Sequence, residues 1–277
     1  MLRFTAPFLV ATAISVSSLW AQEIKADKTE ELFLALGMPD MIEIMRDEGL
    51  SSSRTLGDDM LPGGATTRWM TAVDAIYDLE MMQEEVQGAF REALEGDDLD
   101  AMIAFFTSEL GATVINLEVS ARRALLDDAV DAVSKDNAAI AMLDETPRYL
   151  MIKDFVEAND LIEANVVGAL NSSYAFYLGL IDGGAMPAGM TAESALQDVW
   201  TQEPDIRAST TEWIYAFLLM AYQPLSDEEL EAYIAFSQTE AGQDLNEALF
   251  TSFNGMFDDI SRALGLASSR FIVSQEL

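Results

Sequence analysis

The sequence contains no cysteine and no histidine. Without cysteine, the chain can form no disulfide and carry no lipid on an N-terminal Cys. The two missing residue types also supply most nucleophile–base pairs and most zinc, copper and haem ligands. An enzyme built from this chain would depend on carboxylates, hydroxyls, Tyr, Arg or Lys. We therefore predict no catalytic, cofactor-binding or metal-binding residue.

Basic residues are scarce: 15 Lys and Arg stand against 48 Asp and Glu, which gives a net charge of −33. The negative charge is divided equally between residues 22–134 and 135–277, so it is not an acidic tail. Such a surface repels nucleic acid and anionic lipid headgroups. Half of the residues are hydrophobic, which is enough for one large core or two smaller ones.

Long apolar runs are also missing, except at the N-terminus. Arg3 precedes an uncharged, largely apolar run from Phe4 to Leu19, and the small Ala21 suits cleavage after it. This pattern predicts a signal peptide (residues 1–21) and a periplasmic protein that begins at Gln22. The alternative is an uncleaved anchor, although the run is shorter than the ~20 residues of a spanning helix. The apolar run from Trp213 to Tyr222 is too short to span and predicts a core helix, so we expect no transmembrane segment after signal removal.

The remaining sequence reads as helix almost throughout. Apolar residues recur three and four positions apart, and strand-like alternation is hard to find. Pro39, Pro147 and Pro204 suit first helical positions, and Ser226 with Glu229 forms a capping box. We predict an all-α fold of about ten helices.

Two segments recur in the same order along the chain. The stretch from Leu99 to Gly111 aligns without a gap with Leu230 to Gly242, and Asp40–Ala65 aligns with Asp160–Ala185. Two collinear matches favour an internal duplication. We expect two related antiparallel helical subdomains that pack as one body, with copy one over residues 22–134 and copy two over 135–277. The repeat also predicts that the Ser-rich stretch from Pro39 to about Leu61 is helical, with a kink near Gly49.

The first recurring stretch predicts a helix, a cap and a tight reversal. Apolar residues on both faces predict a sandwiched helix, in which Ala101, Ala104, Ala232 and Ala235 let a neighbouring helix come close. Ser108 and Thr239 each cap the next helix, with Glu109 or Glu240 in its first turn. A hairpin with almost no loop needs one position without a Cβ, which explains a glycine there. The structural motif comprises Leu99, Ile103, Phe105, Ser108, Glu109 and Gly111 in copy one and Leu230, Ile234, Phe236, Thr239, Glu240 and Gly242 in copy two.

Carboxylates in this region allow a second interpretation. Glu109 and Glu240 could instead face a common cleft and bind a cation or perform acid–base chemistry. In the following helix, Glu118 and Arg122 are four residues apart and can pair, which would contribute a few tenths of a kcal/mol if they are exposed.

The pattern L-x-A-x-I-A-F-x-x-[ST]-E-x-G resembles the bacterial family catalogued as domain of unknown function 2059. The segment "LEVSARRALLDDAV", which follows the pattern in copy one, strengthens the resemblance, whereas copy two lacks the Ala-Arg-Arg segment. The resemblance implies an all-helical, exported protein. It implies no activity and no catalytic residue.

Three functions remain open. The first is a non-catalytic module that binds or supports an unidentified macromolecule in the cell envelope. The second is a carrier of a small molecule or lipid, with an apolar cleft between the halves that Trp69, Trp200 and the segment "SSYAFYLGL" could line. The third is a carboxylate-based enzyme. Met38, Met41 and Met45 share a helical face, which suits either core packing or a Cu(I) site.

Overall fold

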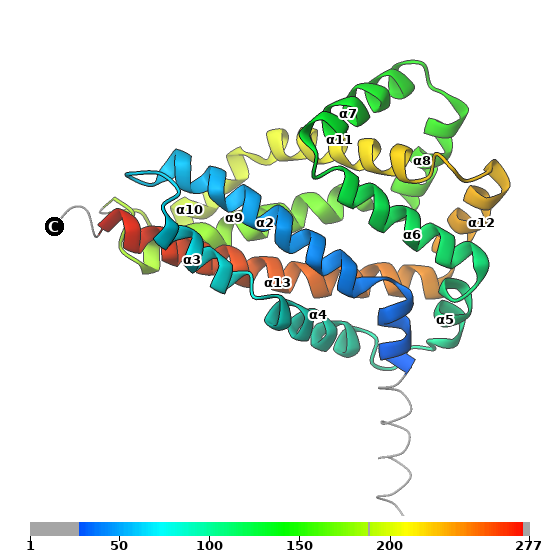
Figure 1. Ribbon diagram of the computed structural model, residues 1–277, viewed down its shortest axis with the longest axis horizontal. Coiled ribbons are helices and arrows are strands. Elements are labelled where there is room, and N and C mark those ends of the chain that lie inside the picture. Colours follow the sequence, from blue (N-terminus) through cyan, green and yellow to red (C-terminus); the bar gives the residue numbers. More distant parts are fainter. Residues whose placement is uncertain (1–27, 188, 274–277) are drawn as a thin grey trace, which may run out of the picture.

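The computed structural model describes residues 28–187 and 189–273, and these ranges are helical with no strand. The signal peptide predicted at residues 1–21 lies outside them. Residues 28–35 are helical, and twelve labelled helices follow (Figure 1). They are α2 (Met38–Met60), α3 (Thr67–Ile76), α4 (Leu79–Ala93), α5 (Asp100–Phe106), α6 (Glu109–Ala124), α7 (Asp128–Leu143), α8 (Pro147–Ala158), α9 (Leu161–Asp182), α10 (Ala192–Thr201), α11 (Glu203–Ala221), α12 (Asp227–Ser237) and α13 (Glu240–Val273).

None of these helices is by itself both long enough and apolar enough to cross a membrane. The pair α5 and α6 meets the length and composition criteria together, but it is bent by 72° at the junction.

Local signals in the sequence set the helix ends as predicted. Prolines stand in the first turns of α2, α8 and α11, and the capping box at Ser226 and Glu229 opens α12. The Ser-rich stretch is helical, and α2 continues through Gly49 without a break. Gly49 lies against the ring of Tyr77, where a Cβ would come within 2.1 Å of Cε1. This glycine therefore serves close packing.

The hydrophobic core does not divide at residue 135. One cluster of buried residues joins residues 32–106 to α13, a second joins α6 and α7 to α8, α11 and α12, and a small third lies between α9 and α10. Helix α13 accordingly packs on α4, and α6 packs on α11. The halves therefore share their cores, and the expected boundary between 134 and 135 falls inside α7.

The longest helix, α13, runs along the length of the molecule beside α9 (Figure 1). Two glycines permit this close contact. A Cβ on Gly179 would lie 2.2 Å from the Arg262 carbonyl oxygen, and one on Gly265 would lie 2.1 Å from that of Phe176. Because both obstacles are backbone atoms, larger residues would force the two helices apart.

The two copies of the recurring motif meet at one end of the molecule, where α5 and α12 lie together (Figure 1). The rings of Phe105 and Phe236 stack there, with centroids 4.0 Å apart and planes at 9°. The prediction that the motif alanines admit a neighbouring helix was wrong. Both helices lie at the edge of the molecule, and these residues are exposed: Ala101, Ala104, Ala232 and Ala235.

The predicted reversals are present in both copies. Ser108 Oγ and Thr239 Oγ1 each accept a hydrogen bond, of 3.1 Å, from the backbone N–H of the glycine three residues later. A Cβ on Gly111 would lie 2.1 Å from the Phe105 carbonyl oxygen, and one on Gly242 would lie 2.3 Å from that of Phe236. Only glycine fits these two positions without displacing the backbone.

Candidate functional site

A cavity of about 630 Å³ opens between helices of the two halves. Helices α2, α5 and α6 come from the first half and α8, α9, α11, α12 and α13 from the second. Most of the lining is apolar, with many aromatic rings: Phe106, Phe155, Trp213, Phe217, Tyr233, Phe236, Phe250, Phe253 and Phe257. This volume lies within the range of about 300–1,000 Å³ that is typical of small-molecule pockets.

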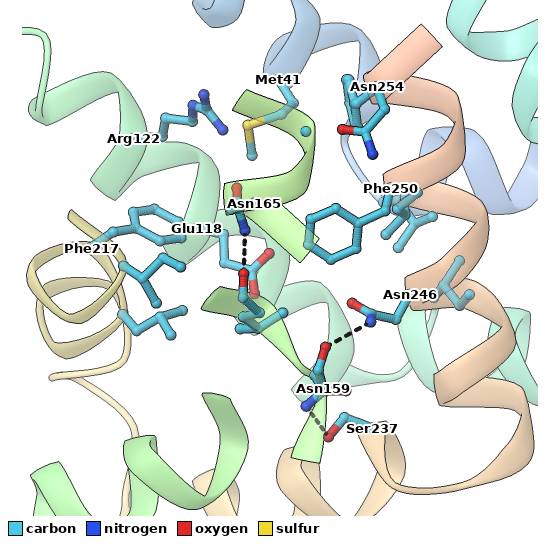
Figure 2. A pocket seen from close by; sticks show the side chains of 18 of the residues that line it. Met41, Glu118, Arg122, Asn159, Asn165, Phe217, Ser237, Asn246, Phe250 and Asn254 are labelled. Atoms are coloured by element: carbon cyan, nitrogen blue, oxygen red, sulfur yellow. Dashed lines mark hydrogen bonds between the residues drawn. The ribbon is translucent and has the colours of Figure 1, made fainter. Parts of the chain in front are cut away.

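A network of side-chain amides forms one end of the cavity (Figure 2). The buried Asn159 donates from Nδ2 to Ser237 Oγ at 3.0 Å, and its backbone carbonyl accepts from Asn246 Nδ2 at 3.1 Å. Gln243 adds a bond of 3.1 Å to Asn159 Oδ1. These bonds fix the junction between α8 and α9 against α12 and α13, and they satisfy polar groups that would be costly to bury alone.

Further polar groups stand in the wall with unused hydrogen-bonding capacity. Asn165 donates to the Leu161 carbonyl oxygen at 2.7 Å, which leaves its own amide oxygen free of protein donors in the described ranges. The side chain of Asn254 lies against Gly168 and makes no hydrogen bond to any described residue. Such groups can orient a ligand that carries a polar end.

Glu118 from α6 places a carboxyl group in this apolar wall. Its Oε1 accepts hydrogen bonds from Tyr222 Oη at 2.5 Å and from Tyr233 Oη at 3.2 Å. Burial raises the pKa of Glu118, and the two phenol donors oppose that shift only in part. Burial and the adjacent carboxyl raise the pKa of both phenols well above 10.0, so both remain donors.

Arg122 lies at another edge of the cavity. It does not pair with Glu118, although the spacing of four residues along the helix allowed such a pair. It makes a two-pronged ion pair with Glu48 of α2, at 3.0 Å from Nε and 2.8 Å from the terminal nitrogen Nη2. The guanidinium also lies over the ring of Trp213, 5.4 Å from the centroid. Because Glu118 is instead hydrogen-bonded by two tyrosines, Arg122 is free to join α2 to α6.

Few of the predicted motif residues reach the cavity; of the twelve, only Phe236 and Gly242 line it. Glu109 and Glu240 are both exposed in the first turns of their helices, and neither faces this space. Among the described residues, Glu118 is the one carboxylate in the wall, so they assemble no pair of carboxylates for acid–base chemistry here. In the described ranges, no three Asp or Glu side chains gather in a geometry that could hold a metal ion.

The aromatic residues suggested for a cleft lie elsewhere. Trp69 is fully buried in the core, and Trp200 is on the surface. The cavity instead uses Trp213 and Phe217, within the run assigned to a core helix, and three aromatic residues of α13 spaced at helical intervals: Phe250, Phe253 and Phe257. Met38, Met41 and Met45 do share a face, and that face lines the cavity. Helical periodicity could have indicated that these side chains share a face, but not that the face borders an open space.

Comparison with known proteins gives one match. No curated protein and no solved structure matches the chain. The family profile described as "Uncharacterized protein conserved in bacteria (DUF2059)" matches residues 80–139, which cover α4, α5, α6 and most of α7 and include Glu118 and Arg122.

Proposed function

We propose that this protein is exported to the periplasm and there binds a small, largely apolar molecule in the cavity between its two halves, without chemical change. The observation that carries the proposal is the cavity itself, with its aromatic lining and its polar end. It favours the carrier over the module that supports a macromolecule, because a module of that kind needs no internal space.

The size of the cavity argues against an accident of packing. Protein interiors are as dense as organic crystals, and unfilled space costs stability in proportion to its volume. A space of about 630 Å³ lined by large apolar side chains is therefore costly when empty. A ligand that fills it with apolar groups recovers the lost contacts, at roughly 0.8 kcal/mol for each buried methylene.

We also infer that the two halves arose by duplication. Residues 28–35 and α2 to α6 follow the same order as α8 to α13, and α7 connects the two series. Corresponding contacts recur: α2 touches α3 and α4 as α9 touches α10 and α11. The last helix of each series packs on the other series at the corresponding place, since α13 packs on α4 and α6 packs on α11. In this arrangement the cavity belongs to the junction of the copies.

The export proposal rests on the N-terminal sequence alone. It is tested by determining the N-terminus of the protein recovered from a periplasmic extract of the producing bacterium. The proposal requires Gln22 as the first residue, and an intact Met1 in that fraction would refute cleavage.

A second candidate function has one observation in its favour. The connecting helix α7 exposes a row of large apolar side chains, with Val133 and Ile140 mostly exposed and Leu143 exposed at 84%. This row could contact a macromolecular partner in the cell envelope. Pull-down with the mature chain, an Ile140→Ser/Leu143→Ser variant and a control Leu34→Ser variant tests it. A partner lost only with the α7 variant supports this candidate, and recovery of the same proteins with all three chains contradicts it.

The carrier proposal is tested by native mass spectrometry of the mature protein purified without detergent. We expect a fraction of the protein to carry one additional small molecule that is released by organic solvent. Protein that is entirely free of ligand, and that also binds none when an extract of envelope lipids and metabolites is added, would contradict the proposal.

A further inference from the structure

We propose that the ligand is an apolar molecule that carries a protonated amine, and that the Glu118 carboxylate receives this amine inside the cavity. The inference rests on the proposed carrier function and names the chemical class of its ligand. It is carried by the hydrogen bonds of Glu118, the charges around the cavity and the aromatic character of its wall.

The two carboxylate oxygens of Glu118 differ in their hydrogen bonds to the protein. Both tyrosine donors bind Oε1, and across the described ranges no protein group donates to Oε2. The side chain lines the cavity, and in Figure 2 the carboxylate lies in the middle of the view, with Phe217 and Phe250 to its two sides. A ligand that fills the cavity excludes water from this oxygen, so the ligand itself must supply a donor, because an unpaired polar group is costly in an apolar wall.

The charges favour a cation as that donor. The protein carries a net charge of −33, so its field draws cations in and repels anions. Among the described residues that line the cavity, Arg122 is the one basic residue, and its guanidinium is already engaged by the ion pair with Glu48 and by the ring of Trp213. An anionic ligand would have to displace Glu48 from a two-pronged ion pair. An ammonium group needs no such displacement.

Aromatic rings line the cavity together with Glu118, and one of them, Tyr233, hydrogen-bonds to it. Tyr233 packs against Phe155 with centroids 5.2 Å apart, and Phe217 stacks on Trp213 at 5.3 Å. The faces of aromatic rings carry partial negative charge, so rings near a carboxylate suit an ammonium. The rest of the wall is apolar and suits a hydrocarbon body.

The test measures binding of three probes with the same ten-carbon chain, decylammonium, 1-decanol and decanoate, to the mature protein by isothermal titration calorimetry at neutral pH. Two variants accompany the wild type. Glu118→Gln keeps the shape of the side chain and an oxygen that accepts from the tyrosines. Glu109→Gln removes one negative charge from an exposed site outside the cavity, and it controls for general attraction of cations.

We expect the wild type to bind decylammonium about tenfold more tightly than decanol, which corresponds to one ion-assisted hydrogen bond, and to bind decanoate most weakly. Glu118→Gln should remove the preference for the amine while it retains binding of decanol, and Glu109→Gln should bind like the wild type. Equal binding of decanol and decylammonium by the wild type would overturn this inference and leave the carrier proposal standing. So would a preference that survives in Glu118→Gln. Failure of all three probes to bind would instead contradict the carrier proposal itself.

Discussion

Phe105 and Phe236 occupy the same position in the two copies of the recurring motif, and their rings stack on one another, with centroids 4.0 Å apart and planes at 9°. In the proposed duplication, a residue that meets its own counterpart lies next to the twofold axis that would relate the two copies. This contact is therefore where the proposed duplication can be tested most locally.

The stacked pair should be energetically coupled. Phe105→Leu, Phe236→Leu and the double variant form a cycle, and urea unfolding measures the free energy of unfolding of each. We expect a coupling of about 0.5–1.5 kcal/mol, because stacked rings contribute that much beyond the area they bury. Strictly additive effects would show that the two motifs meet without interacting.

The glycine of the second reversal should tolerate no side chain. Gly242→Ala places a Cβ 2.3 Å from the Phe236 carbonyl oxygen and 2.7 Å from Ser237 Cα. Thermal and urea unfolding should show a loss of about 1–3 kcal/mol, typical of overpacking. The control is Gly255→Ala in the same helix, where a Cβ meets nothing within 4 Å and alanine should stabilise by about 1 kcal/mol. If the two variants unfold alike, the close approach at Gly242 is refuted.

The ion pair between Arg122 and Glu48 should contribute more to the free energy of unfolding than the neighbouring pair between Arg123 and Asp40. Arg122→Lys loses the two-pronged geometry, and we expect a cost of about 1–2 kcal/mol in the free energy of unfolding. Arg123→Lys is the matched control, because Arg123 reaches Asp40 only at 3.8 Å and both side chains are largely exposed. That change should stay within about 0.5 kcal/mol. Equal losses would mean that the pair with Glu48 does not hold α2 to α6.

Acid should stabilise the wild type relative to Glu118→Gln in the absence of ligand. The folded protein raises the pKa of Glu118 above its ordinary value of 4.5, so the folded state binds its proton more tightly than the unfolded chain does. The benefit is complete below that ordinary value and is lost as the pH rises through the raised pKa. The groups that face this carboxyl are Tyr222 and Tyr233, both uncharged over this range. Urea unfolding of both proteins at several pH values measures the difference, and a difference that is constant with pH would contradict the raised pKa.

The sequence predicted the helices well because their signals are local. Prolines, the capping box at Ser226 and the Ser108 and Thr239 caps act within one turn, and the structure has them as expected. The site was not predictable in the same way. Glu118 hydrogen-bonds to Tyr222 and Tyr233, which lie more than 100 residues later in the sequence. Only the tertiary arrangement brings these partners to it.

The apolar faces were predictable, but their neighbours were not. Periodicity placed Met38, Met41 and Met45 on one side of a helix, yet it could not distinguish a face buried in a core from one that lines a cavity. The small alanines of α5 and α12 suggested close packing and are exposed, because alanine costs little on either side of a helix. Packing between helices that are distant in the sequence determines both where the methionine face lies and whether the alanines are covered.

If the cavity holds a small apolar ligand, a side chain that fills the cavity should block binding. Ala169 of α9 lines the cavity, whereas Val167 of the same helix is exposed. Binding of 1-decanol by Ala169→Phe and by the control Val167→Phe is measured by isothermal titration calorimetry, with circular dichroism to verify that both variants are folded. The carrier account predicts that a folded Ala169→Phe loses at least about tenfold in affinity, or 1.4 kcal/mol, while Val167→Phe binds like the wild type. Wild-type affinity in a folded Ala169→Phe protein would contradict it.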